Sequence, residues 1–250
     1  MNLPYSVYLW HLDVPEERNF LEAEYISFLI HLSEKKLKTK YRRILDLACG
    51  IGRHHKYLRE NGFEVFGVDL NRELIDLAKK RNRGFEVFYQ VGDMRKIGYK
   101  EEFDVVLNWY TSFGYFSDEE NKLVLKNIYR ALKPSGIFIL DVPVKWSEGS
   151  GIILHEDQLV EVIKRKKIND YKFEYKARLY KEEVESLNLK AELELTVTVY
   201  PPSVLKNLLE GAGFKVLYVF ANYGIVNIRN FDLANLTEHG IRRLAWISYK

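Results

Sequence analysis

The stretch Ile44–Arg53 reads ILDLACGIGR, an apolar run that leads directly into a loop containing a cysteine and two glycines. The apolar run predicts a buried strand with Asp46 near its end. Gly50 and Gly52 allow the backbone to turn sharply there and to approach a ligand closely, because glycine has no Cβ. We therefore expect a strand followed by a ligand-binding turn.

The residues after this turn complete a unit. A helix is expected over 53–61, and a second strand over 64–70 contains Asp69 near its end. Strand, glycine turn, helix, strand and acid in this order are typical of a nucleotide-binding βαβ unit, whose acid accepts hydrogen bonds from ribose hydroxyls.

The loop indicates which nucleotide is bound. A dinucleotide-binding turn needs a third small residue where this chain has His55, and the chain has no phosphate-binding Gly-Lys-Ser/Thr. The carboxylate of Asp46 repels a pyrophosphate but suits a cationic ligand. With its D-x-A-C-G-x-G pattern, the loop resembles the first motif of the class I S-adenosylmethionine-dependent methyltransferases.

Further segments extend this resemblance over most of the chain. The similar segments are a strand over 85–92 followed by Asp93 and Met94, a strand over 103–107, the loop 108–116 with its TSFGYF sequence, a helix over 118–132 and the sequence LKPSG at 132–136. The TSFGYF loop is similar to that of a small-molecule-type branch of the family. The resemblance implies a Rossmann-like α/β fold with a seven-stranded, mostly parallel sheet and helices on both faces.

We interpret the chain as a single methyltransferase domain, 1–250. A helical N-terminal cap is expected over 1–40, with Tyr5, Tyr8, Trp10 and His11 as candidate lining residues. The core is expected over 41–150 and 201–250, with its last strands at 215–221 and 243–249.

Residues 151–200 form an insertion. Apolar and polar residues alternate over 172–179 and 187–199, which predicts about three antiparallel strands together with 159–168. In the family a similar sheet covers the acceptor site. The alternative is a sheet that packs on a second copy, which would make a homodimer, and the two roles are compatible.

Composition limits the class of protein. The chain has 250 residues, a net charge of +3 and one cysteine, Cys49. No apolar run is long enough to span a membrane, and the start does not read as a secretory signal. One cysteine favours a cytoplasmic protein, and the mild charge does not favour a nucleic-acid partner.

The resemblance also implies which residues bind S-adenosylmethionine and its product S-adenosylhomocysteine. Asp46 and its loop would hold the methionine end, Asp69 the ribose, Leu70 and the 93–94 pair the adenine, and residues 108–109 the methionyl part. The full set is Asp46, Ala48, Cys49, Gly50, Gly52, Arg53, Asp69, Leu70, Asp93, Met94, Asn108 and Trp109.

A general base is needed only for an acceptor that is protonated at the working pH. We take Tyr115 and His155 as the catalytic candidates, with Asp141 and His11 as alternatives. No metal is expected, because no set of His, Cys and Asp has the spacing of metal ligands.

The sequence thus predicts a methyltransferase that acts on an O, N or C nucleophile of a small-molecule acceptor. An RNA or protein methyltransferase is the alternative enzyme. The chain lacks, however, the two prolines after the fourth strand that shape the nucleobase-holding turn in many enzymes that methylate nucleobase amines. A non-catalytic cofactor-binding partner subunit is the alternative from another class.

Overall fold

The computed structural model describes residues 4–183, 186–222 and 241–250. Its larger sheet contains the strands β1 (Arg43–Leu47), β2 (Glu64–Asp69), β3 (Val87–Val91), β4 (Phe103–Asn108), β5 (Leu132–Pro143), β10 (Lys215–Ala221) and β11 (Arg243–Tyr249). Their order is β10-β11-β5-β4-β1-β2-β3, and β11 runs antiparallel to both of its neighbours while the other pairs are parallel. The predicted seven-stranded, mostly parallel sheet is confirmed.

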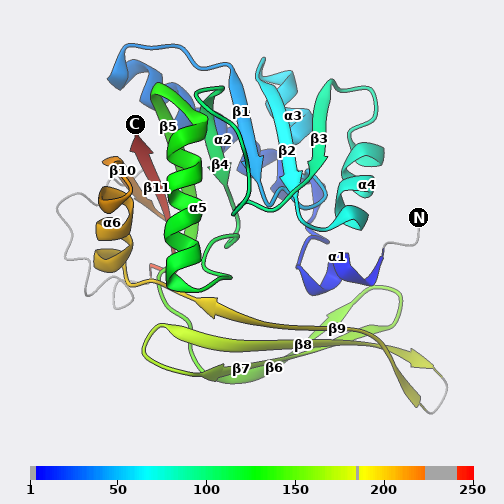
Figure 1. Ribbon diagram of the computed structural model, residues 1–250. Helices are drawn as coiled ribbons and strands as arrows, with labels where there is room; N and C mark the ends of the chain where they lie inside the picture. Colours follow the sequence, from blue (N-terminus) through cyan, green and yellow to red (C-terminus); the bar gives the residue numbers. More distant parts are fainter. Residues whose placement is uncertain (1–3, 184–185, 223–240) are drawn as a thin grey trace.

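Helices cover both faces of this sheet, as predicted (Figure 1). One face packs against α2 (Glu16–Leu37) and α3 (His55–Glu60), and the other packs against α5 (Asp118–Ala131) and α6 (Pro202–Gly211). A further helix, α4 (Arg72–Arg81), contacts β2 and β3. Both faces of the sheet are apolar because helices cover its parallel strands on both sides.

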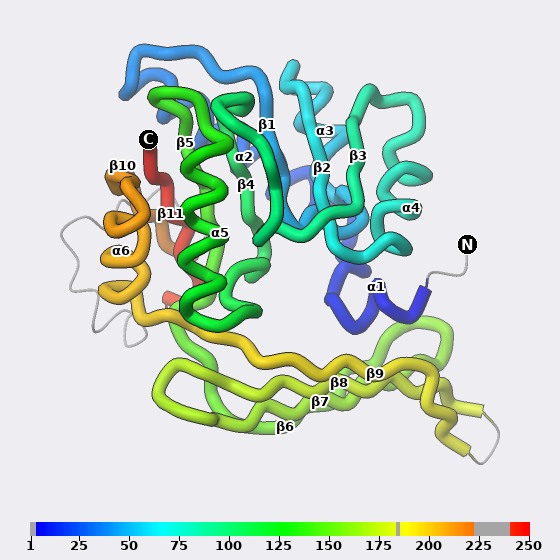
Figure 2. Tube along the Cα trace, in the orientation of Figure 1, coloured from blue at the N-terminus to red at the C-terminus, as the bar shows by residue number. Residues whose placement is uncertain are grey.

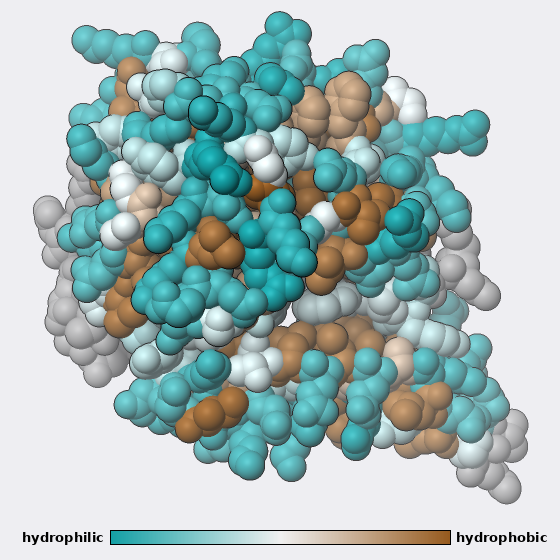
Figure 3. All heavy atoms as spheres, viewed as in Figure 1, coloured by the Kyte–Doolittle hydropathy of each residue, from teal (hydrophilic) through white to brown (hydrophobic). Residues whose placement is uncertain are grey.

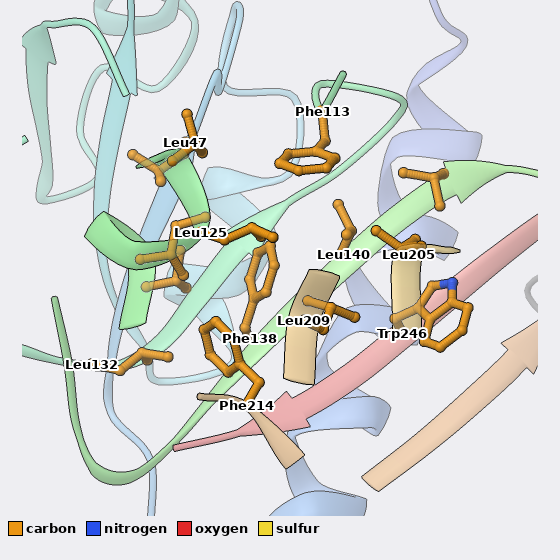
Figure 4. Close-up of a cluster of buried hydrophobic side chains, with 14 of the residues drawn as sticks. Leu47, Phe113, Leu125, Leu132, Phe138, Leu140, Leu205, Leu209, Phe214 and Trp246 are labelled. Carbon is orange, nitrogen blue, oxygen red and sulfur yellow. The ribbon is translucent and has the colours of Figure 1, made fainter. Parts of the chain in front are cut away.

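The core beneath α5 and α6 is densely packed with large side chains (Figure 4). Leu125 of α5 and Leu209 of α6 lie over Phe138 and Trp246 of the sheet, and all four are essentially buried. Burying such a side chain contributes about 1.5–3 kcal/mol. This core fixes α5, whose N-terminus follows the TSFGYF loop.

The insertion is a second, four-stranded sheet of β6 (Gly149–His155), β7 (Leu159–Lys167), β8 (Lys172–Glu183) and β9 (Ser186–Thr198), all antiparallel. The expectation of about three strands was one strand too few. The sequence of β6 begins Gly-Ser-Gly, which reads as a turn, and only its pairing with β7 makes it a strand. The sheet therefore begins at Gly149, within the predicted core segment.

The N-terminal segment is helical, as expected, and contains α1 (Tyr5–Leu9) followed by α2. Figure 2 shows α1 beside the insertion, and α1 contacts β8 and β9. Residues 1–3 of the predicted cap and 223–240 of the predicted core lie outside the described residues. No helix in the described part of the chain is both long enough and apolar enough to cross a bilayer.

Candidate active site

A cavity of about 470 Å³ lies at the carboxyl ends of the central strands. Its walls come from the ends of β1 and β2, from the residues that follow β1, β2, β3 and β4, from the N-terminal segment and from β9. The sheet order reverses between β1 and β4, and ligands of open α/β sheets bind at this kind of switch point. The space-filling view shows a hollow between the core and the insertion, with apolar residues along the insertion's side of it (Figure 3).

The glycine loop has the sharp turn that the sequence predicts. Ala48, Gly50 and Gly52 have φ angles of 57°, 55° and 61°, in the left-handed region that glycine adopts readily. Ala48 and Gly50 line the cavity, as does Cys49. Burial, with the charges of Asp46 and other nearby carboxylates, raises the pKa of the Cys49 thiol well above its usual value, so this thiol is not a nucleophile at neutral pH.

Asp69 joins the glycine loop to the end of β2. Its Oδ2 accepts a hydrogen bond from the amide of Gly50 at 2.8 Å, and its Oδ1 accepts one from the amide of Asn71 at 2.8 Å. Burial raises the pKa of this carboxyl group, and the two backbone donors oppose that shift. Each carboxylate oxygen has a second lone pair, so Asp69 can still accept hydrogen bonds from a ligand in the cavity that it lines.

The carboxylate of Asp46 contacts His55, a residue to which the sequence alone assigns no role. The Nε2 atom of His55 lies 2.9 Å from Asp46 Oδ2, and its Nδ1 atom lies 2.8 Å from the hydroxyl of Tyr89. A neutral imidazole that donates from Nε2 and accepts from Tyr89 satisfies all three groups. His55 is fully buried, so packing fixes the position of its ring. Its contact with Asp46 therefore orients the carboxylate that lines the cavity.

Gly52 makes room for this arrangement. A Cβ atom at Gly52 would lie 2.6 Å from the Tyr89 hydroxyl and 2.8 Å from His55 Nδ1. Gly52 does not line the cavity, and its part in the site is to let these two side chains pack beneath the loop.

Arg53 brings a buried positive charge to the cavity wall. Only 3% of Arg53 is exposed, and its guanidinium contacts Asn19 at 2.5 Å and Glu22 at 3.1 Å. His54 Nε2 lies 2.9 Å from the same Glu22 carboxylate. Burial alone would raise the pKa of Glu22, but His54, Arg53 and Arg18 lower it to about 2. No local pattern in the sequence indicates Glu22, because the charges meet only when α2 packs on α3.

The predicted adenine end also lies in the cavity wall. Leu70, Asp93 and Met94 all line the cavity, and Leu70 is 64% exposed. The Asp93 carboxylate pairs with the guanidinium of Arg95 at 2.7 Å, and this pairing lowers the pKa of Asp93.

The loop after β4 forms another part of the cavity wall. Trp109 and Tyr110 line the cavity, and Tyr110 and Thr111 adopt left-handed φ angles of 59° and 68°. Asp141 of β5 accepts a hydrogen bond from the Tyr110 amide at 3.1 Å and pairs with Arg243 of β11. Asp141 is absent from the cavity wall, so its position favours a role in holding this loop.

Tyr115 is the catalytic candidate that the structure places in the cavity wall. Its ring centroid lies 5.8 Å from that of Trp10, which lines the cavity with Leu12. Burial raises the pKa of the Tyr115 hydroxyl, although Arg243 opposes this shift, so the hydroxyl stays protonated at neutral pH. Leu193 of β9 closes the wall beside it.

The structure places two other predicted site residues outside the cavity wall. Asn108 is fully buried behind it and donates a hydrogen bond to the carbonyl oxygen of Leu47 at 3.0 Å, which joins the ends of β4 and β1. His155 lies on the insertion between the carboxylates of Asp13 and Glu161. Among the described residues, no group of His, Cys, Asp and Glu has the arrangement of a metal site.

Comparisons with known proteins agree with this geometry. Residues 44–136 match the family model described as a methyltransferase domain. The putative methyltransferase YqeM of Bacillus subtilis is 38% identical over 103 residues, which are 40% of this chain and 42% of that protein. The chain thus matches less than half the length of this relative.

Solved structures match over nearly the whole chain. An S-adenosylmethionine-dependent methyltransferase from Clostridium acetobutylicum has a TM-score of 0.77 at 17% identity and covers 97% of this chain and 95% of its own. CalS10 is an amino pentose methyltransferase from Micromonospora echinaspora whose structure was solved with S-adenosylmethionine bound. Its TM-score is 0.71 at 17% identity, and the match covers 100% of this chain and 98% of CalS10. At such identities the likeness concerns the fold. Residues 44–136 thus match a methyltransferase domain, and the chain has the Rossmann-like fold of the S-adenosylmethionine-dependent methyltransferases whose structures it resembles.

Proposed function

We propose that this protein transfers the methyl group of S-adenosylmethionine to a nucleophilic atom of a small-molecule acceptor. The observation that carries the proposal is the convergence of Asp46, Asp69 and Asp93 on one cavity that begins at a glycine turn. Three carboxylates at the ends of neighbouring strands suit a ligand with an ammonium group, ribose hydroxyls and an adenine amino group. The match of residues 44–136 to a methyltransferase domain supports the same ligand.

The residues present fit this cofactor along its length. Asp46, oriented by His55, would face the methionine ammonium group, and the buried Arg53 guanidinium would face the methionine carboxylate. The free lone pairs of Asp69 would accept from the ribose hydroxyls. Leu70 offers an exposed apolar surface on which adenine would pack, beside Asp93.

When bound, this cofactor supplies a methyl group that is activated by the positive charge on sulfur. The residues of this chain would position the reactants, which can contribute on the order of 7–11 kcal/mol to a reaction of two bound partners. The aromatic rings of Trp109 and Tyr115 in the cavity wall would also favour a positive charge near their faces.

We infer that the acceptor atom is an amine nitrogen or a hydroxyl oxygen, and an amine is favoured by the likeness to an amino pentose methyltransferase. The lone pair of the nucleophile forms a bond to the methyl carbon as the bond from carbon to sulfur breaks, and that electron pair stays on sulfur. The proton of the methylated atom then leaves to water. Because the Tyr115 hydroxyl stays protonated, it would orient the acceptor by hydrogen bonding and would not act as a base at neutral pH.

Calorimetric titration with S-adenosylmethionine, S-adenosylhomocysteine and NAD tests the cofactor. We expect micromolar binding of the first two and none of NAD. Acceptors would then be screened by incorporation of labelled methyl groups, starting with small amines. Binding without methyl transfer to any acceptor would favour a non-catalytic partner subunit, and salt-sensitive binding of RNA would favour a nucleic-acid methyltransferase.

We further propose that the insertion joins two copies of the chain. We also propose that the protein acts in the cytosol, where the buried thiol of Cys49 would remain reduced. The strand pairing places five exposed apolar side chains on the outer face of this sheet: Ile152, Leu154, Val162, Leu187 and Leu189. The edge strand β6 has no charged residue from Gly149 to Leu154, although charges usually protect such edges. A second copy related by a two-fold axis offers an identical edge for antiparallel pairing.

Light scattering after size-exclusion chromatography tests this interface. We expect a dimer for the wild type and a monomer for Leu154→Lys, while Leu123→Lys, at an exposed position of α5, should remain dimeric. A monomeric wild type at micromolar concentration would contradict the proposal.

A further inference from the structure

His155 lies between two carboxylates that come from different parts of the fold. Its Nδ1 atom is 2.8 Å from Asp13 Oδ2, in the segment between α1 and α2, and its Nε2 atom is 3.0 Å from Glu161 Oε2 on β7. The His155 side chain is 6% exposed and that of Glu161 is fully buried. Both ring nitrogens therefore face a group that accepts hydrogen bonds when it is ionised.

This geometry fits an imidazole ring that carries a proton on both nitrogens. A neutral ring has a single N–H, so one of the two carboxylates would face a nitrogen lone pair. A buried carboxylate such as Glu161 is costly unless a positive charge is paired with it. The doubly protonated ring satisfies Asp13 and Glu161 together and neutralises one of their two charges.

The groups around this ion pair come from four elements. The N-terminal segment contributes Tyr8, whose ring packs edge-on against His155 with centroids 5.1 Å apart, and His11, whose Nε2 is 3.6 Å from Glu161 Oε1. His11 Nε2 also lies 2.9 Å from the hydroxyl of Tyr175 on β8. The other charged groups nearby are Glu156 and Asp157 in the turn after β6 and Arg165 on β7.

The same N-terminal segment covers the cofactor cavity. Trp10 and Leu12 line the cavity, whereas His11 and Asp13, which alternate with them, contact the insertion. Leu12 lies directly over the glycine loop, because a Cβ atom at Gly50 would be 3.0 Å from its Cδ1. A contact that fixes Asp13 against the insertion therefore also fixes the neighbouring Leu12 over Gly50.

We propose that His155 is a positioning residue: it links Asp13 to Glu161 and so holds the segment 10–13 closed over bound cofactor. The proposal rests on the proposed function, because it concerns the same cavity. Its consequence is that a variant without the contacts from His155 to Asp13 and Glu161 has a looser cover and binds cofactor less tightly. His155 would act without touching the acceptor or the methyl group.

The test is calorimetric titration of the full chain with S-adenosylhomocysteine at a single pH. For His155→Gln, which keeps a polar side chain but cannot make both contacts of the imidazole ring, we expect Kd to rise about tenfold above that of the wild type. His31→Gln, at a histidine of α2 whose ring lies near Ser27 and Phe63, is the control and should bind like the wild type.

A second variant covers the case in which His155→Gln does not fold. Asp13→Asn removes one charge at the more exposed side of the bridge and should also weaken binding. In the double variant Asp13→Asn with Glu161→Gln, we expect the losses to be non-additive, since both act through the same ring.

The outcomes separate this inference from the proposed function. If the wild type binds neither S-adenosylmethionine nor its product, the proposed function fails. If the wild type binds and His155→Gln or Asp13→Asn binds equally well, the bridge does not position the cover and the inference is overturned. Weaker binding by His155→Gln, with wild-type affinity in His31→Gln, supports it.

Discussion

The amide of Thr198, the last residue of β9, donates a hydrogen bond to the carbonyl oxygen of Gly114 at 2.7 Å. Gly114 lies in the TSFGYF loop, so this bond joins the loop of the proposed acceptor site to the base of the insertion. A Cβ atom at Gly114 would lie 2.2 Å from the Thr198 carbonyl oxygen, and its φ angle is 105°. The loop and the insertion can approach this closely only because residue 114 is glycine.

Gly114→Ala should therefore lower the free energy of unfolding by about 2 kcal/mol or more, because backbone strain and a steric clash act together. Urea denaturation measures the loss. The matched control is Gly84→Ala, where φ is 94° and a Cβ atom would meet nothing within 4 Å. Equal losses in the two variants would show that the contact with Thr198 does not matter.

Asp69→Asn should weaken the binding of S-adenosylmethionine about 100-fold. The substitution removes the charge that accepts from the ribose in the proposed site, and a hydrogen bond to a charged group contributes about 1.5–3 kcal/mol. Isothermal titration measures the affinity, and Asp76→Asn, at an exposed position of α4, should bind like the wild type. Wild-type affinity in Asp69→Asn would move the ribose away from this carboxylate.

Tyr115→Phe should reduce kcat about tenfold or more and leave the Kd of the cofactor nearly unchanged, because its hydroxyl is proposed to orient the acceptor. Tyr89→Phe makes an informative comparison, since the Tyr89 hydroxyl contacts His55 beneath the glycine loop. Tyr89→Phe should raise the Kd of the cofactor by a larger factor than it lowers kcat. Steady-state kinetics and cofactor titration on both variants separate the two roles.

The pH dependence of stability should reveal the buried cluster around Glu22. The pKa of Glu22 is about 2 in the folded protein, below its ordinary value of 4.5, so its contribution to stability is present above about pH 4.5 and lost as the pH falls towards 2. Burial also lowers the pKa of His54, so stability already begins to fall below the ordinary histidine value of 6.5.

Unfolding curves from pH 7 to pH 2 measure this loss. Glu22→Gln should be less stable at neutral pH, because Arg53 loses its partner, and should lose less stability between about pH 4.5 and pH 2. Glu17→Gln, at an exposed position of the same helix, is the control. A wild-type profile in Glu22→Gln would mean that other groups cause the acid sensitivity.

Most of the core could be predicted from the sequence, because each strand and helix carries its own apolar pattern and its own turn residues. The strands of the larger sheet, their order along the chain and cavity-lining residues such as Asp46, Asp69 and Met94 follow from motifs that are local in the chain. β6 was missed because its glycines weaken the strand pattern, and β7 supplies the pairing that compensates.

The parts that could not be predicted depend on contacts between distant segments. His155 is 142 residues from Asp13, and Glu22 meets Arg53 across 31 residues, so no local spacing indicates either pair. Asn108 illustrates the opposite case: its place after β4 indicates the site, but its side chain turns back to Leu47. Motifs thus locate the site, whereas the direction of each side chain is set by packing.

The position of β11 has a consequence for how the protein forms during synthesis. β10 precedes β11 in the chain, yet β11 lies between β10 and the rest of the sheet. While the ribosome has made only β10, this strand has no neighbour in the sheet to pair with. The sheet can therefore be completed only after residue 249 has emerged, and Arg243 reaches Asp141 behind the loop after β4 at the same step. A nascent chain that already contains every proposed cofactor-binding residue would still lack a finished site.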